Sequence, residues 1–214
     1  MAVQSDSFAE TIRRHRPLVV LLGPTAAGKS AVAVQVAKRF GTEILTADSR
    51  QVYRGMDIGT DKPSLEERQG IAHRLIDLVD PDEPYNTGRY RRDALAEIDR
   101  VIREGRLPFV VGGTGLYIRT LIRGTCEAPA ADEVIRRELM ALVAAQGREA
   151  LHAELTRVDP VTASRLHPND ESKVIRALEV FRLAGCSLAS LQAQHQLQAA
   201  AFPTLLIGLQ RPKE

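Results

Sequence analysis

The stretch Pro17-Leu-Val-Val-Leu-Leu22, which runs directly into Gly23-Pro-Thr-Ala-Ala-Gly28-Lys29-Ser30, decides the fold. The first part is apolar on both faces, which is typical of a central parallel strand covered by helices. The second part matches G-x-x-x-x-G-K-[ST], the P-loop pattern. Apolar residues then recur at helical spacing (Val32, Ala33, Val36, Ala37 and Phe40) until Gly41, which is typical of a helix C-cap. We therefore expect a strand, a phosphate-binding turn and a helix in succession.

The next part of the chain continues this alternation. Residues 1–16 are polar, and we expect them to be frayed. Because strands alternate with helices, the pattern predicts an α/β fold, with a P-loop NTPase-like parallel sheet flanked by helices. The expected strands are 43–47, 75–79 and 107–111, the expected helices 88–104 and 114–123, and the expected long loop 48–63.

The pattern changes after Gly124, where helical periodicity continues without a strand. Helices are expected at 132–145, 148–155, 161–166 and 172–183, and 204–209 is expected to return to the sheet as a strand. The sequence thus predicts a P-loop catalytic core (1–124), a helical insertion (125–200) and a return strand (201–214).

The composition is that of an ordinary globular protein. The chain has 214 residues, 44% of them apolar and 26% charged, with a formal net charge of +2. These values exclude disordered and fibrous classes, and no apolar run approaches the ~20 residues that cross a bilayer. Cys126 and Cys186 have no metal-ligand spacing, so neither a disulfide nor a zinc site is expected. We expect a cytoplasmic monomer without membrane contact.

The P-loop has a clear chemical meaning, because its main-chain N–H groups converge on phosphate oxygens. Lys29 adds a cation, and the Ser30 hydroxyl is a ligand for Mg²⁺. A plain glycine turn is the structural alternative. A hydrolase would also need a strand ending in aspartate, but 107–111 runs into Gly112-Gly113-Thr114-Gly115, and only Asp77 or Asp80 could substitute. The candidate phosphate-binding residues are Gly23, Thr25, Ala26, Ala27, Gly28, Lys29 and Ser30.

A second polar cluster, Asp48-Ser49-Arg50-Gln51-Val52-Tyr53-Arg54-Gly55, follows the second expected strand. Ligands bind beyond the carboxyl ends of parallel strands, where the P-loop also lies. Asp48 is a candidate general base beside the phosphates, or alternatively a turn cap. Tyr53 is a candidate for stacking on a base or for ordinary packing.

Five ordered segments carry a family resemblance: GPTAAGKS, ADSRQVYRGMDIGTDKP, HRLIDLVDP, VVGGTGLYIRTL and RLHPNDESKVIRALEV. Together they resemble the tRNA dimethylallyltransferase (tRNA isopentenyltransferase) family from about residue 17 to residue 209. The resemblance implies transfer of a dimethylallyl group from dimethylallyl diphosphate to N6 of the adenosine beside the anticodon, with release of pyrophosphate. It implies tRNA as partner and Mg²⁺ as cofactor.

The resemblance also implies roles for single residues. Asp48 corresponds to the general base, and Lys29 with Mg²⁺ at Ser30 stabilises the leaving diphosphate. Thr114 contacts the adenosine or the bridging oxygen, although an N-cap is an equally good interpretation of this residue. A solvated surface helix is the alternative for the last two residues among the implied tRNA contacts, which are Asp48, Ser49, Arg50, Gln51, Thr114, Lys173 and Arg176.

Two departures from the family pattern stand out. His73-Arg74 replaces the usual pair of histidines, and we expect His73 to be structural. The chain ends at Glu214, whereas family members usually continue, so it resembles a fragment or a shortened member with part of its apolar sheet uncovered. Two alternatives remain: a P-loop kinase for a small molecule or nucleotide, and an inactive truncated module that binds diphosphate or RNA.

Overall fold

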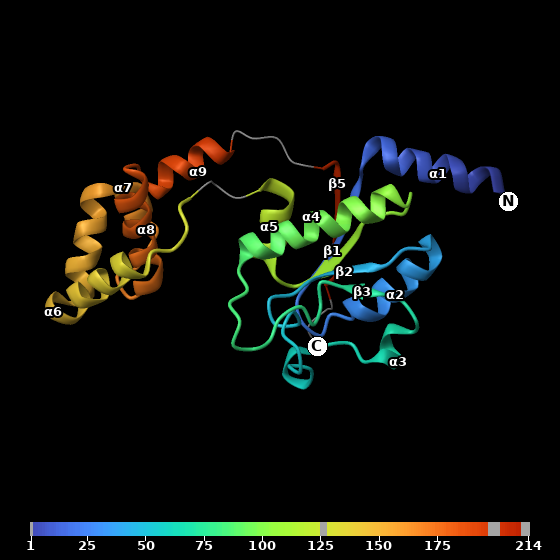
Figure 1. The fold of residues 1–214 in the computed structure, drawn as a ribbon, viewed down its shortest axis with the longest axis horizontal. Coiled ribbons are helices and arrows are strands. Elements are labelled where there is room, and N and C mark those ends of the chain that lie inside the picture. Colours follow the sequence, from blue (N-terminus) through green and yellow to red (C-terminus); the bar gives the residue numbers. More distant parts are fainter. Residues whose placement is uncertain (1, 125–127, 197–201, 211–214) are drawn as a thin grey trace. The chain divides into compact units, whose positions relative to one another are not determined.

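The computed structural model describes residues 2–124, 128–196 and 202–210 (Figure 1). The chain divides into two compact units. Unit 1 comprises residues 1–124 and 200–214, and unit 2 comprises residues 125–199. The P-loop and the Asp48 cluster both belong to unit 1.

Unit 1 is built on a parallel sheet in the strand order β3-β2-β4-β1-β5, which confirms the predicted fold class. The strand after the P-loop helix, β2, is not the neighbour of β1. The later strand β4 lies between β1 and β2. This order places the carboxyl ends of β1, β2 and β4 side by side. The strands are β1 (Leu18–Leu22), β2 (Ile44–Ala47), β3 (His73–Arg74), β4 (Phe109–Gly112) and β5 (Thr204–Gly208).

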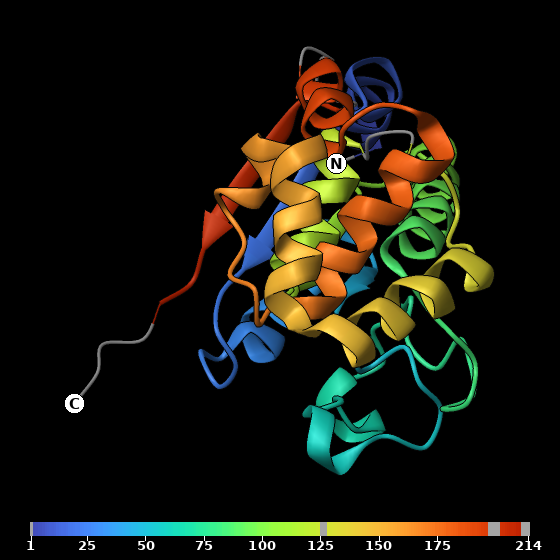
Figure 2. The ribbon, with the colours of Figure 1, turned by 90° about the vertical axis from the view of Figure 1, so that its left-hand side faces the viewer.

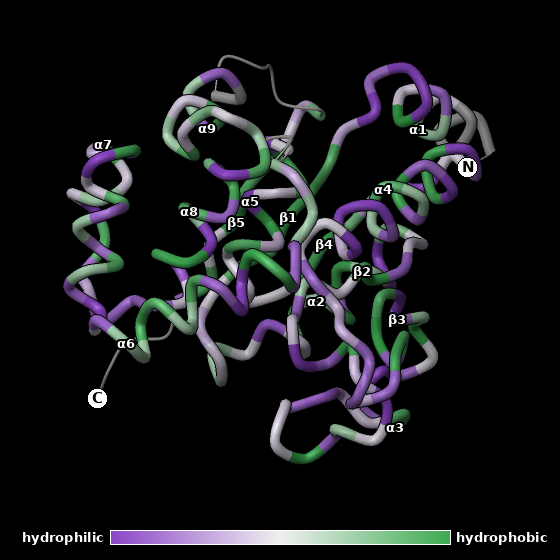
Figure 3. Tube along the Cα trace, turned by 60° about the vertical axis from the view of Figure 1, so that its left-hand side comes forward, coloured by the Kyte–Doolittle hydropathy of each residue, from purple (hydrophilic) through white to green (hydrophobic). Residues whose placement is uncertain are grey.

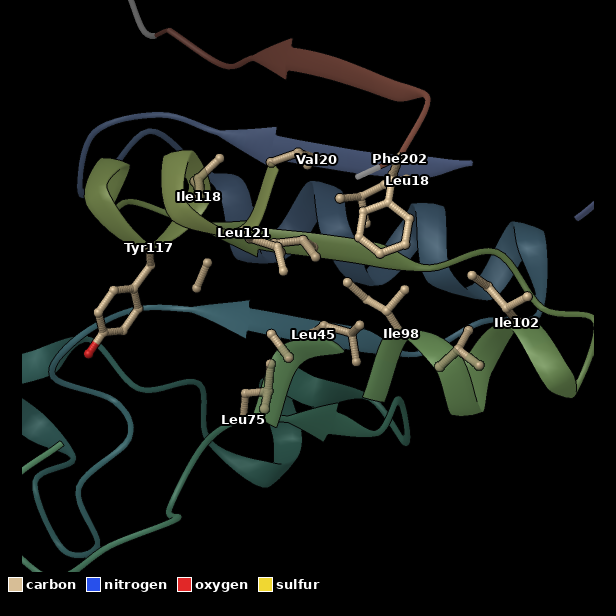
Figure 4. Close-up of a cluster of buried hydrophobic side chains, with 14 of the residues drawn as sticks. Leu18, Val20, Leu45, Leu75, Ile98, Ile102, Tyr117, Ile118, Leu121 and Phe202 are labelled. Carbon is tan, nitrogen blue, oxygen red and sulfur yellow. The ribbon is translucent and has the colours of Figure 1, made fainter. Parts of the chain in front are cut away.

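Three helices supply the main apolar core over one face of this sheet. They are α1 (Ala2–His15), α4 (Thr87–Arg103) and α5 (Gly115–Arg123). Figure 4 shows Ile98 of α4 and Leu121 of α5 packed beside Leu18 and Leu45 of the strands. The strands β1, β2 and β4 are the apolar interior of unit 1, and their hydropathy colours can be followed in Figure 3.

The P-loop helix α2 (Lys29–Phe40) packs against strand residues and forms a second core cluster with them. Its contact face is made of Ala33, Val34 and Ala37, whose short side chains let the helix lie close to the sheet. Val32 and Phe40 are exposed, contrary to the expected apolar face. The helix ends at Gly41 in the left-handed conformation (φ 59°), as the sequence predicts.

Two expectations for unit 1 are wrong. The polar N-terminal segment forms α1, because Ile12 is buried in the main core and anchors the helix. Residues 75–79 do not form a strand, because Leu75 and Asp77 adopt positive φ angles of 62° and 55° that interrupt an extended backbone. Only a single bridge, from Val79 to Tyr53, continues the pairing beyond β3.

The connection from β2 to β3 contains two short helices, η1 (Ile58–Thr60) and α3 (Leu65–Arg68). Figure 2 shows this connection standing out from the sheet. Ser64 and Glu67 form a reciprocal capping box at the start of α3, which fixes that turn without any core contact.

Strand β5 is the most exposed strand of unit 1. Leu205, Leu206 and Ile207 are all accessible to solvent, although β5 pairs with β1 along its length. Apolar surface on the sheet was expected from the sequence, and it lies on this strand.

The regular elements among the described residues of unit 2 are all helices. Its elements are α6 (Glu133–Val158), α7 (Pro160–Ala163), α8 (Glu171–Ala184) and α9 (Leu188–Gln196). Gly147 (φ 84°, ψ 172°) interrupts α6 between the two helices expected there. The α9 helix was not expected, because its apolar residues show no helical stripe.

Two buried carboxylates organise unit 2. Glu179, with 0% of its side chain exposed, accepts hydrogen bonds from Arg136 Nε at 2.9 Å and Asp132 N at 2.7 Å. Burial raises the pKa of Glu179, but Arg176, the Asp132 amide and Arg136 outweigh burial and lower it. Asp159 caps two helices, through Oδ1 to Thr162 N at 3.0 Å and Oδ2 to Ala189 N at 3.1 Å.

None of the described helices is both long enough and apolar enough to cross a membrane.

The contact between β2 and β4 leaves no room for a side chain at Gly112. A Cβ placed there would lie 2.1 Å from the Ala47 carbonyl oxygen. We predict that Gly112→Ala lowers the free energy of unfolding by about 1–3 kcal/mol, because the two strands must separate to admit the methyl group. Urea denaturation followed by circular dichroism measures this loss.

The matched control is Gly115→Ala, three residues after Gly112 in the sequence. No atom lies within 4 Å of a Cβ at Gly115, which begins α5. This variant should lose no stability, because alanine favours the helix. Equal losses in both variants would contradict the steric explanation.

Candidate active site

The P-loop wraps around the start of α2. Gly28 is the N-cap of this helix in the left-handed conformation (φ 84°), and Ala26 also has a positive φ of 63°. Lys29 Nζ donates a hydrogen bond to the Pro24 carbonyl at 2.6 Å, so the side chain folds back over the turn. The first N–H groups of α2 have no intrahelical acceptor, which makes this end of the helix a site for anions.

Gly23 fits the P-loop for a steric reason. A Cβ at this position would lie 2.3 Å from the carbonyl oxygen of Leu209, the residue that follows β5. The Leu209 amide in turn donates to Leu22 O at 2.8 Å. The chain after β5 therefore supports the outer side of the P-loop, and only glycine permits this approach.

A cleft lies between the P-loop and the carboxyl end of β2. Thr25, Lys29 and Ser30 line it on one side, and Asp48 lines it on the other. The sequence predicted that these two segments would meet at the ends of the parallel strands, and the structure brings them together. The remaining lining residues are Ala33, Ile44, Thr46, Gln51, Thr60, Asp61, Pro63, His73, Val111, Gly112 and Gly113.

The Asp48 side chain forms the turn cap that was the structural alternative for this residue. Its Oδ1 accepts hydrogen bonds from Arg50 N at 2.8 Å and Gln51 N at 3.3 Å, which is a turn cap. Among the described residues, no donor is bonded to Oδ2. One oxygen thus fixes the orientation of the carboxylate, which lines the cleft.

Thr114 lies beside Asp48 but does not cap its helix. Its Oγ1 accepts a hydrogen bond from Ser49 N at 3.0 Å, and its own amide donates to Ala47 O at 3.2 Å. The residue occupies the N-cap position of α5 without a side-chain capping bond. Thr114 therefore joins the end of β4 to the end of β2, where Asp48 begins the polar cluster.

The Gln51 amide is used inside the protein. Its Nε2 donates to the carbonyl oxygens of Thr60, at 3.1 Å, and Asp61, at 3.0 Å. This pair of bonds folds residues 48–63 back on themselves and makes Thr60 and Asp61 a wall of the cleft. A tRNA contact by the Gln51 amide, as the family resemblance implies, would have to use its carbonyl oxygen.

Lys62 was missed by the sequence analysis. Only 3% of its side chain is exposed, and Nζ donates to Asp57 Oδ1 and Asp77 Oδ1, both at 2.6 Å, and to Tyr53 O at 2.8 Å. Burial lowers the pKa of Lys62, but the two carboxylates outweigh burial and raise it. The only available signal was a lysine among closely spaced aspartates in a long loop.

The two possible substitutes for a hydrolase aspartate are both used elsewhere. Asp77 is paired with Lys62, and Asp80 accepts from Arg54 Nη1 at 2.9 Å. Neither residue lines the cleft. Tyr53 contributes its carbonyl to Lys62 and a backbone bridge to Val79, so its main chain has a structural role.

His73 and Arg74 point to different surroundings. His73 lines the cleft with its Nδ1 at 3.0 Å from Ile71 O, as expected of a structural histidine. Arg74 Nε donates to Glu43 Oε2 at 2.7 Å, at the start of β2. Arg74 thus holds a buried carboxylate at the opposite end of the strand from Asp48.

The two expected tRNA contacts in unit 2 differ in their surroundings. Lys173 is exposed and pairs with Asp170 at 3.2 Å. Arg176 is bonded to Glu179 and to Pro129 O, so its guanidinium holds the core of unit 2.

The cysteines and the possible metal ligands form no metal site in the part of the chain that the structure describes. Cys186 is a free thiol, and Cys126 lies outside the described residues. Among the residues that the structure describes, no group of three or more His, Cys, Asp or Glu side chains is arranged to hold a metal ion.

Sequence comparisons agree with the motif order. A family model described as IPP transferase matches residues 51–214, and one described as isopentenyl transferase matches residues 17–80. The chain belongs to the IPP transferase family. Its relatives include "tRNA dimethylallyltransferase 2" of Geotalea uraniireducens, which is 50% identical over 90% of this chain and 62% of the relative.

The match to "tRNA dimethylallyltransferase" of Syntrophobacter fumaroxidans covers nearly the whole chain. The two sequences are 46% identical over 98% of this chain and 63% of the relative. The chain therefore spans about 60% of the length of the curated relatives it matches.

Solved structures of this family share the fold. The chain is similar to a eukaryotic dimethylallyltransferase acting on tRNA, with a TM-score of 0.78, 32% identity and coverage of 90% of this chain and 48% of the other. It is also similar to the tRNA isopentenylpyrophosphate transferase of Bacillus halodurans, with a TM-score of 0.56, 41% identity and coverage of 90% and 59%.

His73 predicts a pH dependence of stability. Burial, together with Arg68, lowers its pKa below the ordinary value of 6.5, against the opposing effect of the Ile71 carbonyl. A lowered pKa means that the folded state binds the proton less readily than the unfolded state. This contribution to stability is therefore complete above pH 6.5 and is lost as the pH falls through the lowered pKa.

We predict that His73→Gln reduces this loss on acidification. Urea unfolding at a series of pH values on both sides of the ordinary histidine pKa provides the comparison. A variant whose stability falls as steeply as the wild type would show that other groups carry the dependence.

Proposed function

We propose that this protein transfers a dimethylallyl group from dimethylallyl diphosphate to N6 of the tRNA adenosine next to the anticodon. The observation that carries the proposal is the cleft that the P-loop and Asp48 line together. A phosphate cradle beside one carboxylate suits a reaction with a diphosphate leaving group and a nucleophile that must lose a proton. Membership of the IPP transferase family and relatives called tRNA dimethylallyltransferases support the substrates.

The P-loop would hold the diphosphate of the donor. Its main-chain amides and the N-terminus of α2 are oriented before the substrate arrives, and the Lys29 ammonium lies on the same turn. Negative charge grows on the bridging oxygen as the C–O bond breaks. Donors fixed in advance stabilise this charge at little reorganisation cost. The proposed cradle comprises Gly23, Thr25, Ala26, Ala27, Gly28, Lys29 and Ser30.

The cleft also fits Mg²⁺. The ion prefers oxygen ligands, keeps several waters and commonly joins one or two protein oxygens to substrate phosphates. Ser30 offers a hydroxyl ligand on the wall of this cleft, on the same side as Lys29. Bound Mg²⁺ would supply positive charge to the diphosphate.

Asp48 would act as the general base. The N6 nitrogen forms a bond to C1 of the dimethylallyl group while the C1–O bond breaks and its electron pair leaves with pyrophosphate. The amine becomes strongly acidic during this attack, and Oδ2 of Asp48 takes its proton. The turn hydrogen bonds to Oδ1 hold the carboxylate in place during the transfer.

Thr114 and its neighbours would place the nucleoside. Ser49 N donates to the Thr114 oxygen, and the Thr114 hydroxyl donates to Ser49 Oγ at 3.4 Å, a long bond that the adenosine or the bridging oxygen would replace. Ser49, Arg50 and Gln51 line the approach from β2, where a base turned out of its stack would enter.

The remaining assignments are proposals at a coarser level. We propose that unit 1 carries catalysis and that unit 2 contacts tRNA, with Lys173 as an exposed phosphate ligand and Arg176 contributing through its position on the same helix. We also propose that the protein acts in the cytoplasm as a monomer.

The proposed activity predicts a defined product. Incubation with unmodified tRNA, Mg²⁺ and dimethylallyl diphosphate should yield tRNA that contains N6-dimethylallyl adenosine, together with equimolar pyrophosphate. Mass spectrometry of nuclease digests detects the nucleoside. Phosphate transfer from ATP without this product would favour a kinase, and binding of tRNA without turnover would indicate a binding module.

Asp48→Asn separates the two roles of the carboxylate. The asparagine oxygen still accepts the amides of Arg50 and Gln51, but the side chain no longer accepts a proton from N6. We predict that kcat falls by about a hundred- to ten-thousandfold while the affinity for dimethylallyl diphosphate stays unchanged. Single-turnover assays and calorimetry measure the two quantities.

The control is Asp80→Asn, which removes a carboxylate from the ion pair with Arg54 outside the cleft. This variant should keep full activity. If Asp48→Asn retained normal kcat, the base would have to be another group.

A further inference from the structure

Ile58 is the most exposed of the large apolar residues that the structure describes. Its side chain is 100% exposed, at the first position of η1. Solvation of a whole isoleucine side chain forfeits the stabilisation that burial would give. A position that gains nothing for the fold in this way invites a functional explanation.

The loop around Ile58 is held rigidly by hydrogen bonds. Lys62 Nζ bonds Asp57 Oδ1 on one side of η1, and the Gln51 amide bonds the Thr60 and Asp61 carbonyls on the other. The Thr60 hydroxyl also donates to Met56 O and Asp57 O. The exposure of Ile58 is therefore built into a fixed turn.

The turn stands at the entrance of the candidate active site. A surface hollow lined by Arg50 and residues 55–60 adjoins the cleft that contains Asp48, because Thr60 lines both. Arg50 is exposed at the same hollow and offers a cation to a phosphate. An apolar tip and a guanidinium thus flank the path by which a base would reach Asp48.

We propose that Ile58 is a wedge that enters the anticodon loop of bound RNA and fills the gap left when the target adenine moves toward Asp48. The inference rests on the proposed function and deepens it. Unstacking a base costs free energy, and proteins that kink or open nucleic acids commonly insert an apolar side chain between bases. Arg50 would bind the phosphate beside the gap.

RNA is favoured over a protein partner by this setting. A protein-binding surface needs a large contiguous apolar patch, whereas Met56 is the only other large apolar residue among those that line the hollow with Ile58. The hollow is also lined by the exposed Arg50, whose guanidinium can bind a phosphate. A single isoleucine on a rigid turn has the right size to stack against one base.

The test uses an RNA stem-loop with 2-aminopurine in place of the target adenosine. This base fluoresces when it leaves the stack and has no amino group at position 6, so the measurement needs no chemistry. The wild type should raise the fluorescence on binding. Ile58→Ala should abolish most of this rise and raise the Kd for the stem-loop about tenfold, while the affinity for dimethylallyl diphosphate is unchanged.

Leu65→Ala is the matched control, because Leu65 is also an exposed aliphatic residue (82%) but belongs to α3 and lines neither hollow. It should behave as the wild type, and Ile58→Met should restore the fluorescence rise. Equal behaviour of Ile58→Ala and the wild type would overturn the proposal, as would a wild type that binds the stem-loop without any rise.

The outcomes distinguish this inference from the proposed function. Prenylated product from both the wild type and Ile58→Ala at equal kcat/KM would leave the activity intact and remove the wedge. A fluorescence rise that depends on Ile58, without prenylated product from the wild type, would support the wedge and reject the transferase.

Discussion

The pairing of β4 with both β1 and β2 is the constraint on which the candidate active site depends. The P-loop continues from β1 and Asp48 from β2, so only the strand between them sets their separation. The Ala47 backbone lies so close to Gly112 that no side chain fits at position 112. Thr114, directly after β4, then ties the two ends together through Ser49 and Ala47. Chemistry at this site is a consequence of strand order.

Buried charges fix what the sheet does not. Glu43 accepts from Arg74, Arg100 and Arg106 at the amino ends of the strands, and Lys62 bonds two carboxylates in the long loop. Each buried charge has several partners, which offsets the cost of removing it from water. The apolar core sets the position of the strands, and these clusters set the conformation of the segments between them.

The sequence was most informative where one local pattern determined the structure. The apolar run before Gly23 and the glycine at position 41 predicted β1 and the end of α2 because both depend on neighbouring residues alone. Residues 2–15 were misjudged because a single buried side chain, Ile12, decides whether that polar segment docks. The 75–79 segment was misjudged because its positive φ angles are imposed by contacts with distant parts of the chain. Thr25, Lys29, Ser30, Asp48 and Gln51 of the cleft belong to motifs that mark them in the sequence, whereas Lys62 acts through partners five and fifteen positions away.

Asp159 has a consequence for how unit 2 assembles. One carboxylate serves the first turns of two helices, each through a different oxygen. An asparagine amide in its place has only one acceptor oxygen, and a hydroxyl would reach only one turn. No amide or hydroxyl side chain of similar size therefore accepts from both helix starts. The two helix starts are thereby coupled: whichever forms first orients the acceptor for the other, and neither unravels without weakening its companion. Cooperativity between distant turns of a small helical array can reside in a single shared side chain.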